Sequence, residues 1–110
     1  MDLLQLHCKC LLLPIPEKEY RFHPTRRWRA DYFFANAVSG KPLAVEIEGG
    51  IFTKGRHTRG KGAEGDMEKY DEMTIMGIAL LRFTPDQVEK GTAALTIQRW
   101  LEARNERNEA

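Results

Sequence analysis

Two glutamates stand two residues apart in a segment where apolar and polar residues alternate, Leu43–Glu48. On a β-strand, residues two apart point to the same face, so Glu46 and Glu48 would lie side by side. Such carboxylates repel each other unless a cation or a basic side chain lies between them. Asp31 lies on the preceding predicted strand, and a hairpin would bring it close to Glu46. Three converging carboxylates suit a hard divalent cation such as Mg²⁺.

A magnesium ion held in this way could support phosphodiester hydrolysis. It lowers the pKa of a bound water, polarises the phosphoryl group and steadies the leaving oxygen. Glu48 could orient or deprotonate that water if it is not itself a ligand. The alternative is an exposed polar strand face on which Glu46 and Glu48 pair with arginines, because two glutamates on a strand are not a specific signal.

A glycine-rich basic loop forms the second group of candidate residues, in the sequence from Lys54 to Gly62. Glycines let a backbone approach phosphates closely, and cations supply affinity for a polyanion. The loop is not a Walker A motif, because Gly62 follows Lys61 where serine or threonine is required. Together with the earlier arginine patch, the expected DNA-binding residues are Arg26, Arg27, Arg29, Lys54, Arg56, His57, Arg59 and Lys61.

The charge of the chain is unevenly distributed, although the net charge is only +1. Residues 21–61 contain nine basic and three acidic residues, whereas residues 62–110 contain six basic and ten acidic ones. A basic middle segment indicates a one-sided field that suits a polyanion partner, and a solvated charged surface is the alternative. Trp28 lies among the arginines, where we expect a core position in preference to base stacking.

The elements that must position these residues follow from periodicity and turn signals. We expect a helix within residues 1–13, a short strand at 20–23 and strands at 29–34 and 43–48. A helix at 64–76, a strand at 78–83 and a helix from Pro85 to about residue 104 follow. Thr84 and Gln87 are placed to form a capping box at the start of the last helix, with Pro85 in its first position. A parallel step from 43–48 to 78–83 through the intervening helix completes the pattern. The predicted fold is α/β, with a mixed central β-sheet flanked by helices.

The length of 110 residues suits a single domain, with a core over about residues 19–103 and a frayed tail at 104–110. No apolar run approaches the roughly 18 residues that would span a membrane, so we expect no membrane partner. We expect Cys8 and Cys10 to be reduced thiols, which favours a reducing cytoplasm.

Three stretches resemble the PD-(D/E)XK nuclease superfamily, over roughly residues 19–88. They are Arg29-Ala30-Asp31-Tyr32, Leu43-Ala44-Val45-Glu46-Ile47-Glu48-Gly49-Gly50 and Gly77-Ile78-Ala79-Leu80-Leu81-Arg82-Phe83. Within the superfamily they are similar to phage-type nucleases, very-short-patch-repair endonucleases, VRR-NUC domains and archaeal-type Holliday junction resolvases. The resemblance implies a restriction-endonuclease-like core and the cytoplasm of a bacterial or phage-infected host cell.

The resemblance also implies roles for single residues. Asp31 and Glu46 would be the metal carboxylates, with the backbone carbonyl of Ile47 as a further ligand for Mg²⁺ or Mn²⁺. Glu48 stands where many relatives have lysine and some have glutamate. Other relatives carry that lysine on the next helix, where Lys69 is the candidate; an exposed lysine paired with an acid is the alternative.

Glu19, just before the first predicted strand, is a candidate additional acid. The resulting expectation is a Mg²⁺-dependent, structure-specific DNA endonuclease, in its sharpest form a Holliday junction resolvase acting on branched DNA as a homodimer. The alternatives are a nicking repair or restriction-type nuclease of the same fold, a catalytically weak DNA-binding module, and a structural phage protein with an incidental charge pattern.

Overall fold

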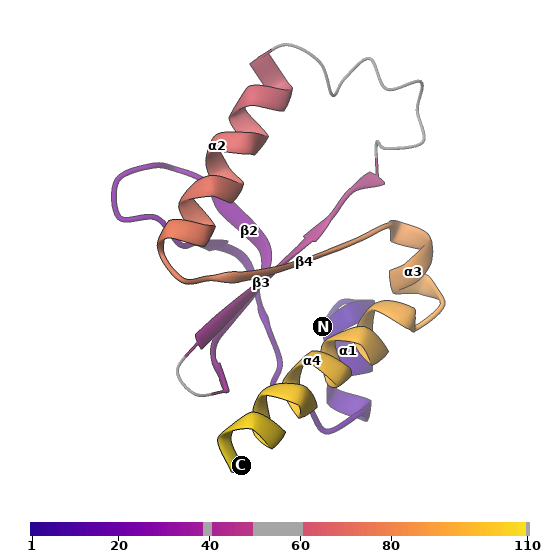
Figure 1. Ribbon diagram of the computed structural model, residues 1–110. Helices are drawn as coiled ribbons and strands as arrows, with labels where there is room; N and C mark the ends of the chain where they lie inside the picture. Colours follow the sequence, from indigo (N-terminus) through magenta and orange to yellow (C-terminus); the bar gives the residue numbers. More distant parts are fainter. Residues whose placement is uncertain (39–40, 50–60, 110) are drawn as a thin grey trace.

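A four-stranded mixed sheet with helices on both faces forms the body of the protein (Figure 1). The computed structural model describes residues 1–38, 41–49 and 61–109, and the side chains of residues 1–35, 41–49 and 64–103. The elements in chain order are α1 (Leu3–Cys10), β1 (Glu17–Arg21), β2 (Arg29–Val38), β3 (Lys41–Ile47), α2 (Lys61–Ile75), β4 (Ala79–Phe83), α3 (Pro85–Glu89) and α4 (Thr92–Glu109). The predicted α/β class is therefore confirmed.

The strands lie in the order β1-β2-β3-β4. The β1–β2 and β2–β3 pairs are antiparallel, with Tyr32 opposite Val45, so the predicted hairpin is confirmed. The β3–β4 pair is parallel, with Val45 opposite Leu81, as the predicted crossover through a helix requires. This register fixes which charged residues of neighbouring strands meet.

The two faces of the sheet are covered differently. Helices α1, α3 and α4 lie on one face, where Leu4, Val45, Phe83 and Ile97 belong to one buried cluster (Figure 1). Helix α2 covers the opposite face, where Met73 joins a second cluster with aromatic and small side chains from the strands. The alternation of β3 sends its apolar residues to both clusters, and Glu46 lies on the α2 face.

Capping chemistry begins α3 as the sequence predicts. Thr84 accepts a hydrogen bond from the backbone N–H of Gln87, and the Gln87 side chain accepts one from the backbone N–H of Thr84. The prediction of one continuous helix from Pro85 was wrong. Gly91 adopts a φ of 84°, which glycine tolerates at low cost, and the chain divides there into α3 and α4.

Other boundaries also moved. Strand β1 begins at Glu17 and ends at Arg21, earlier than predicted, and β2 extends to Val38. The backbone of α4 continues to Glu109, where a frayed tail was expected after about residue 104.

Trp28 packs against the cluster beneath α2, as expected of a core position. In the part of the chain that the structure describes, no helix has the length and apolarity to cross a membrane.

Packing of α4 against the sheet yields the first prediction. Ile97 is fully buried in α4, whereas Leu95, two residues earlier, is half exposed. Ile97→Ala should lower the free energy of unfolding by about 2–5 kcal/mol, because it removes buried methyl groups and leaves a cavity. Urea unfolding followed by circular dichroism measures this loss, and Leu95→Ala, which should cost about 0.5 kcal/mol or less, is the matched control. Equal losses for both variants would contradict this packing.

Candidate active site

Glu46 is a buried acid at the end of β3, with 5% of its surface exposed. It lies one residue beyond the Tyr32–Val45 pair, which places it beside Asp31 of β2. The two acids bridge the strands reciprocally. Glu46 Oε2 accepts the backbone N–H of Asp31 at 2.8 Å, and Asp31 Oδ2 accepts the backbone N–H of Ile47 at 2.7 Å. Here side-chain carboxylates accept the backbone N–H hydrogen bonds that backbone carbonyls accept elsewhere in the ladder.

Lys69 of α2 completes this group on the face of the sheet that α2 covers. Its ammonium donates a hydrogen bond to Glu46 Oε1, and only 14% of the lysine side chain is exposed. A buried carboxylate requires such a partner, because removing a charge from water costs several kcal/mol. The structure thus brings together Asp31, Glu46 and Lys69 from three elements. Lys69 pairs with an acid, as in the alternative interpretation, but its side chain is largely buried.

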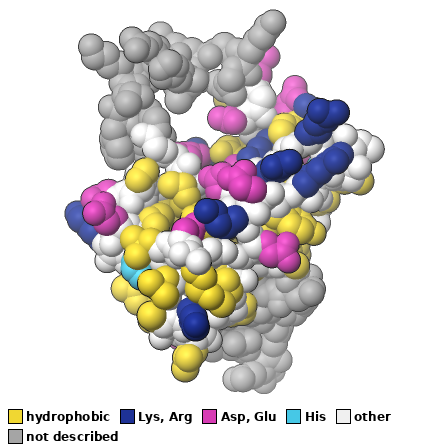
Figure 2. Space-filling model, turned by 180° about the vertical axis from the view of Figure 1, so that it is seen from behind, with side chains coloured by type: hydrophobic (Ala, Val, Ile, Leu, Met, Phe, Trp, Pro, Cys, Tyr) yellow, Lys and Arg dark blue, Asp and Glu magenta, His cyan; other side chains and the backbone are white. Residues whose placement is uncertain are grey.

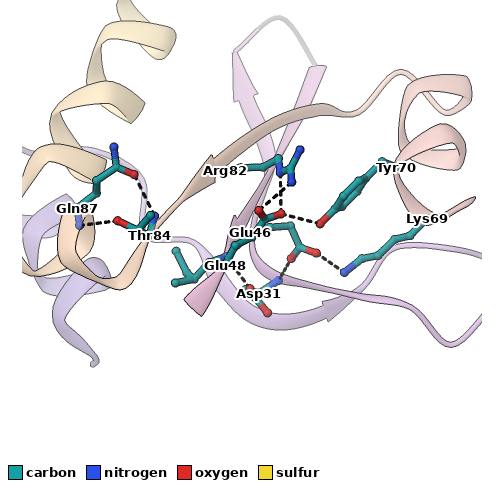
Figure 3. A network of polar contacts seen from close by, with 9 residues as sticks. Asp31, Glu46, Glu48, Lys69, Tyr70, Arg82, Thr84 and Gln87 are labelled. Atoms are coloured by element: carbon teal, nitrogen blue, oxygen red, sulfur yellow. Dashed lines mark hydrogen bonds and ion pairs between the residues drawn. The ribbon is translucent and has the colours of Figure 1, made fainter. Parts of the chain in front are cut away.

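Glu48 belongs to a second group beside the first (Figure 3). Arg82 of β4 donates to its two oxygens through Nε at 2.6 Å and Nη2 at 2.8 Å. The Tyr70 hydroxyl donates to Glu48 Oε1 at 3.0 Å, and the Arg82 guanidinium lies 5.2 Å from the centre of the Tyr70 ring. Because Arg82 lies opposite Glu46 in the parallel register, the two groups adjoin each other.

The two glutamates differ in their electrostatics. Burial raises the pKa of Glu46, and the hydrogen bonds from Lys69 and the Asp31 backbone only partly offset that effect. Hydrogen bonding to Arg82 lowers the pKa of Glu48 despite its partial burial. Burial and the bond to Glu48 raise the pKa of Tyr70, so its hydroxyl remains a donor at neutral pH. Glu48 is consequently a weak base, whereas Glu46 is the carboxylate that its surroundings bring closest to accepting a proton.

The donor set bears on the predicted metal. The described side chains contain no group of three or more acids, histidines or cysteines arranged around one cation position. Two carboxylates, Asp31 and Glu46, do adjoin. That number fits Mg²⁺, which is commonly held by one or two carboxylates together with waters and substrate phosphates. Glu48 points instead to Arg82 and Tyr70, so in this arrangement it is not the third converging acid.

Glu19 lies in the middle of β1 with a φ of 52°, an uncommon left-handed conformation for a residue with a side chain. The register of β1 with β2 would set it opposite Asp31, but that pair is missing from the described ladder. The exposed Glu19 side chain has no hydrogen bond or ion pair with any described residue. Its predicted role as an additional acid stays a prediction.

The expected DNA-binding residues fall into two sets. Arg26, Arg27 and Arg29 are exposed in and after the β1–β2 connection, where Arg26 lies 3.9 Å from the Trp28 ring and pairs with Glu68 of α2. Seen from the back of Figure 1, basic and acidic side chains interleave across the molecule (Figure 2). Lys54, Arg56, His57 and Arg59 lie outside the described residues, and so does the side chain of Lys61 at the start of α2.

Two residues of the site escaped the sequence analysis. Neither Tyr70 nor Arg82 was assigned a role in the site, although Arg82 belongs to the third stretch that carries the resemblance. The available signal was the single charged residue within the apolar run Ala79–Phe83. A parallel neighbour of β3 with such a residue can place it beside Glu46.

No family model, curated protein or solved structure matches this chain.

The Lys69–Glu46 contact gives the second prediction. Lys69→Met should lower the free energy of unfolding at pH 7 by about 3 kcal/mol, because it leaves a buried carboxylate without its charged partner. Glu46 already has a pKa above its ordinary 4.5, and losing Lys69 raises it further. The destabilisation should therefore shrink as the pH falls through that raised pKa, where the carboxyl becomes neutral.

Urea unfolding at pH 7 and at pH 5 measures this dependence. Lys90→Met is the matched control, because Lys90 pairs with Asp86 on the surface of α3 and should contribute less than about 1 kcal/mol at either pH. A loss for Lys69→Met that is equally large at both pH values would refute the buried ion pair as its cause.

Proposed function

We propose that the protein is a metal-dependent endodeoxyribonuclease of the PD-(D/E)XK kind. The observation that carries the proposal is the contact of Asp31, Glu46 and Lys69, two acids and a lysine supplied by β2, β3 and α2. The resemblance assigned these residue types to metal binding and phosphodiester hydrolysis. Their meeting across three elements supports that assignment, because the sequence separates them by up to 38 positions.

Asp31 and Glu46 would hold the ion, with the Ile47 carbonyl as a further ligand. Bound there, Mg²⁺ or Mn²⁺ supplies an activated water and neutralises charge on the phosphoryl oxygens. Lys69 adds a fixed positive charge next to Glu46, which stabilises negative charge developing on a nearby phosphate. Hydrogen bonds between β2, β3 and α2 would hold these three side chains in place before DNA binds.

The order of elements supports a restriction-endonuclease-like core. The first acid lies on one strand, the second acid ends the antiparallel neighbour, and a helix leads to a parallel strand on the far side. Exposed arginines near α2 provide cations for a DNA backbone. The sharpest form of the proposal is a homodimeric resolvase of branched DNA, since a four-way junction needs two symmetric cuts.

Cleavage of labelled DNA tests this proposal. The substrates are a synthetic four-way junction, linear duplex, flap and single strand, each with Mg²⁺, Mn²⁺ or EDTA. Glu46→Gln and Asp31→Asn should reduce cleavage by about 100-fold or more, because each removes a charged ligand while keeping the side-chain shape. Glu102→Gln, an exposed acid on α4 across the sheet, should cut as wild type does.

The pattern of products separates the alternatives. Paired symmetric nicks only in the junction support the resolvase, and metal-dependent cutting of the other substrates supports a repair or restriction-type nuclease. DNA binding without cutting under either metal would overturn the nuclease and leave the DNA-binding module.

A further inference from the structure

We propose that Arg82 is a phosphate-binding residue of this site, and that Glu48 and Tyr70 are positioning residues that hold its guanidinium in place. The inference rests on the proposed function for its ligand, the DNA backbone. It assigns Glu48 a role that differs from metal binding or water activation. The three contacts among Glu48, Tyr70 and Arg82 carry it.

The guanidinium retains unused donors. It has five N–H bonds, and the Glu48 carboxylate takes one from Nε and one from Nη2. The other N–H bonds, including both on Nη1, meet no acceptor among the described residues. More than half of the Arg82 side chain, 53%, is exposed, so these donors are accessible to a ligand.

The orientation of the Arg82 guanidinium is fixed by two partners, Glu48 and Tyr70. Glu48 binds one edge of the planar group through two parallel hydrogen bonds, and the Tyr70 ring lies beside it at 5.2 Å. Tyr70 in turn donates its hydroxyl to the same carboxylate. An arginine held in this way loses less conformational freedom when it binds a phosphate than a free surface arginine would.

The register of β4 places Arg82 beside the candidate metal-binding group. Arg82 lies opposite Glu46 in the β3–β4 register, so a phosphate bound to it would lie near Asp31, Glu46 and Lys69. The five charged side chains of the site have a formal net charge of −1, and without Arg82 it would be −2. They are the acids Asp31, Glu46 and Glu48 and the bases Lys69 and Arg82. Arg82 thus lowers the repulsion that a phosphate meets, and a bound divalent cation would make the group positive.

The salt dependence of DNA binding tests the inference without requiring cleavage. Binding of a fluorescent duplex is measured by anisotropy in EDTA across a series of KCl concentrations. Arg82→Gln should reduce the slope of log K against log [KCl] by about 0.9, because one phosphate contact is lost. Arg99→Gln is the matched control: it removes the same charge from an exposed position on α4, on the opposite face.

Conservative variants separate charge from geometry. Arg82→Lys should keep the wild-type slope but bind about tenfold more weakly, because an ammonium lacks the planar fork. Glu48→Gln retains Arg82 and should keep the wild-type slope. An unchanged slope for Arg82→Gln, or wild-type affinity for Arg82→Lys, would overturn the inference. Failure of cleavage with these binding results intact would overturn only the proposed nuclease.

Discussion

The burial of the Glu46 carboxylate is the constraint on which the site depends. A charge with 5% exposure needs compensation from its surroundings, and here it comes from the Lys69 ammonium and the Asp31 backbone N–H. These partners belong to α2 and β2, so one carboxylate ties together three elements. A shift of the β2–β3 register by one residue would turn Glu46 away from α2 and leave its carboxylate without Lys69. The contacts of Glu46 thus join β2, β3 and α2 at the candidate site.

The neighbouring glutamates Glu46 and Glu48 show how their surroundings give one residue type opposite pKa shifts. Glu46 has a raised pKa because burial dominates, and Glu48 has a lowered pKa because Arg82 dominates. Two guanidinium donors hold the Glu48 carboxylate in its charged form, whereas burial opposes the charged form of Glu46. Two acids two residues apart on the same face of a strand can therefore differ in their electrostatics.

Periodicity and local turn chemistry were sufficient to predict much of the fold. The alternation around Val45 predicted β3 and its hairpin with β2, and Thr84 and Gln87 predicted the start of α3. The helix break at Gly91 was missed, because an isolated glycine near a helix is a weak signal until its φ is known. In the site, Asp31 and Glu46 followed from adjacent strands. The contacts of Arg82 and Tyr70 could not be predicted from the sequence, because they depend on both the β3–β4 register and the rotation of α2 about its axis.

Polar contacts carry much of the attachment of α2 to the sheet. Met73 is the only buried residue among the described side chains of this helix, and Tyr70 is partly buried. Lys69 binds Glu46, Tyr70 binds Glu48, and Glu72 binds His23 at 2.9 Å next to the β1–β2 connection. A helix with so small an apolar face gains its orientation from these pairs. The residues that attach α2 to the sheet are therefore also residues of the candidate site, so a change in charge at Glu46 or Glu48 would alter the contacts of the helix as well as the site.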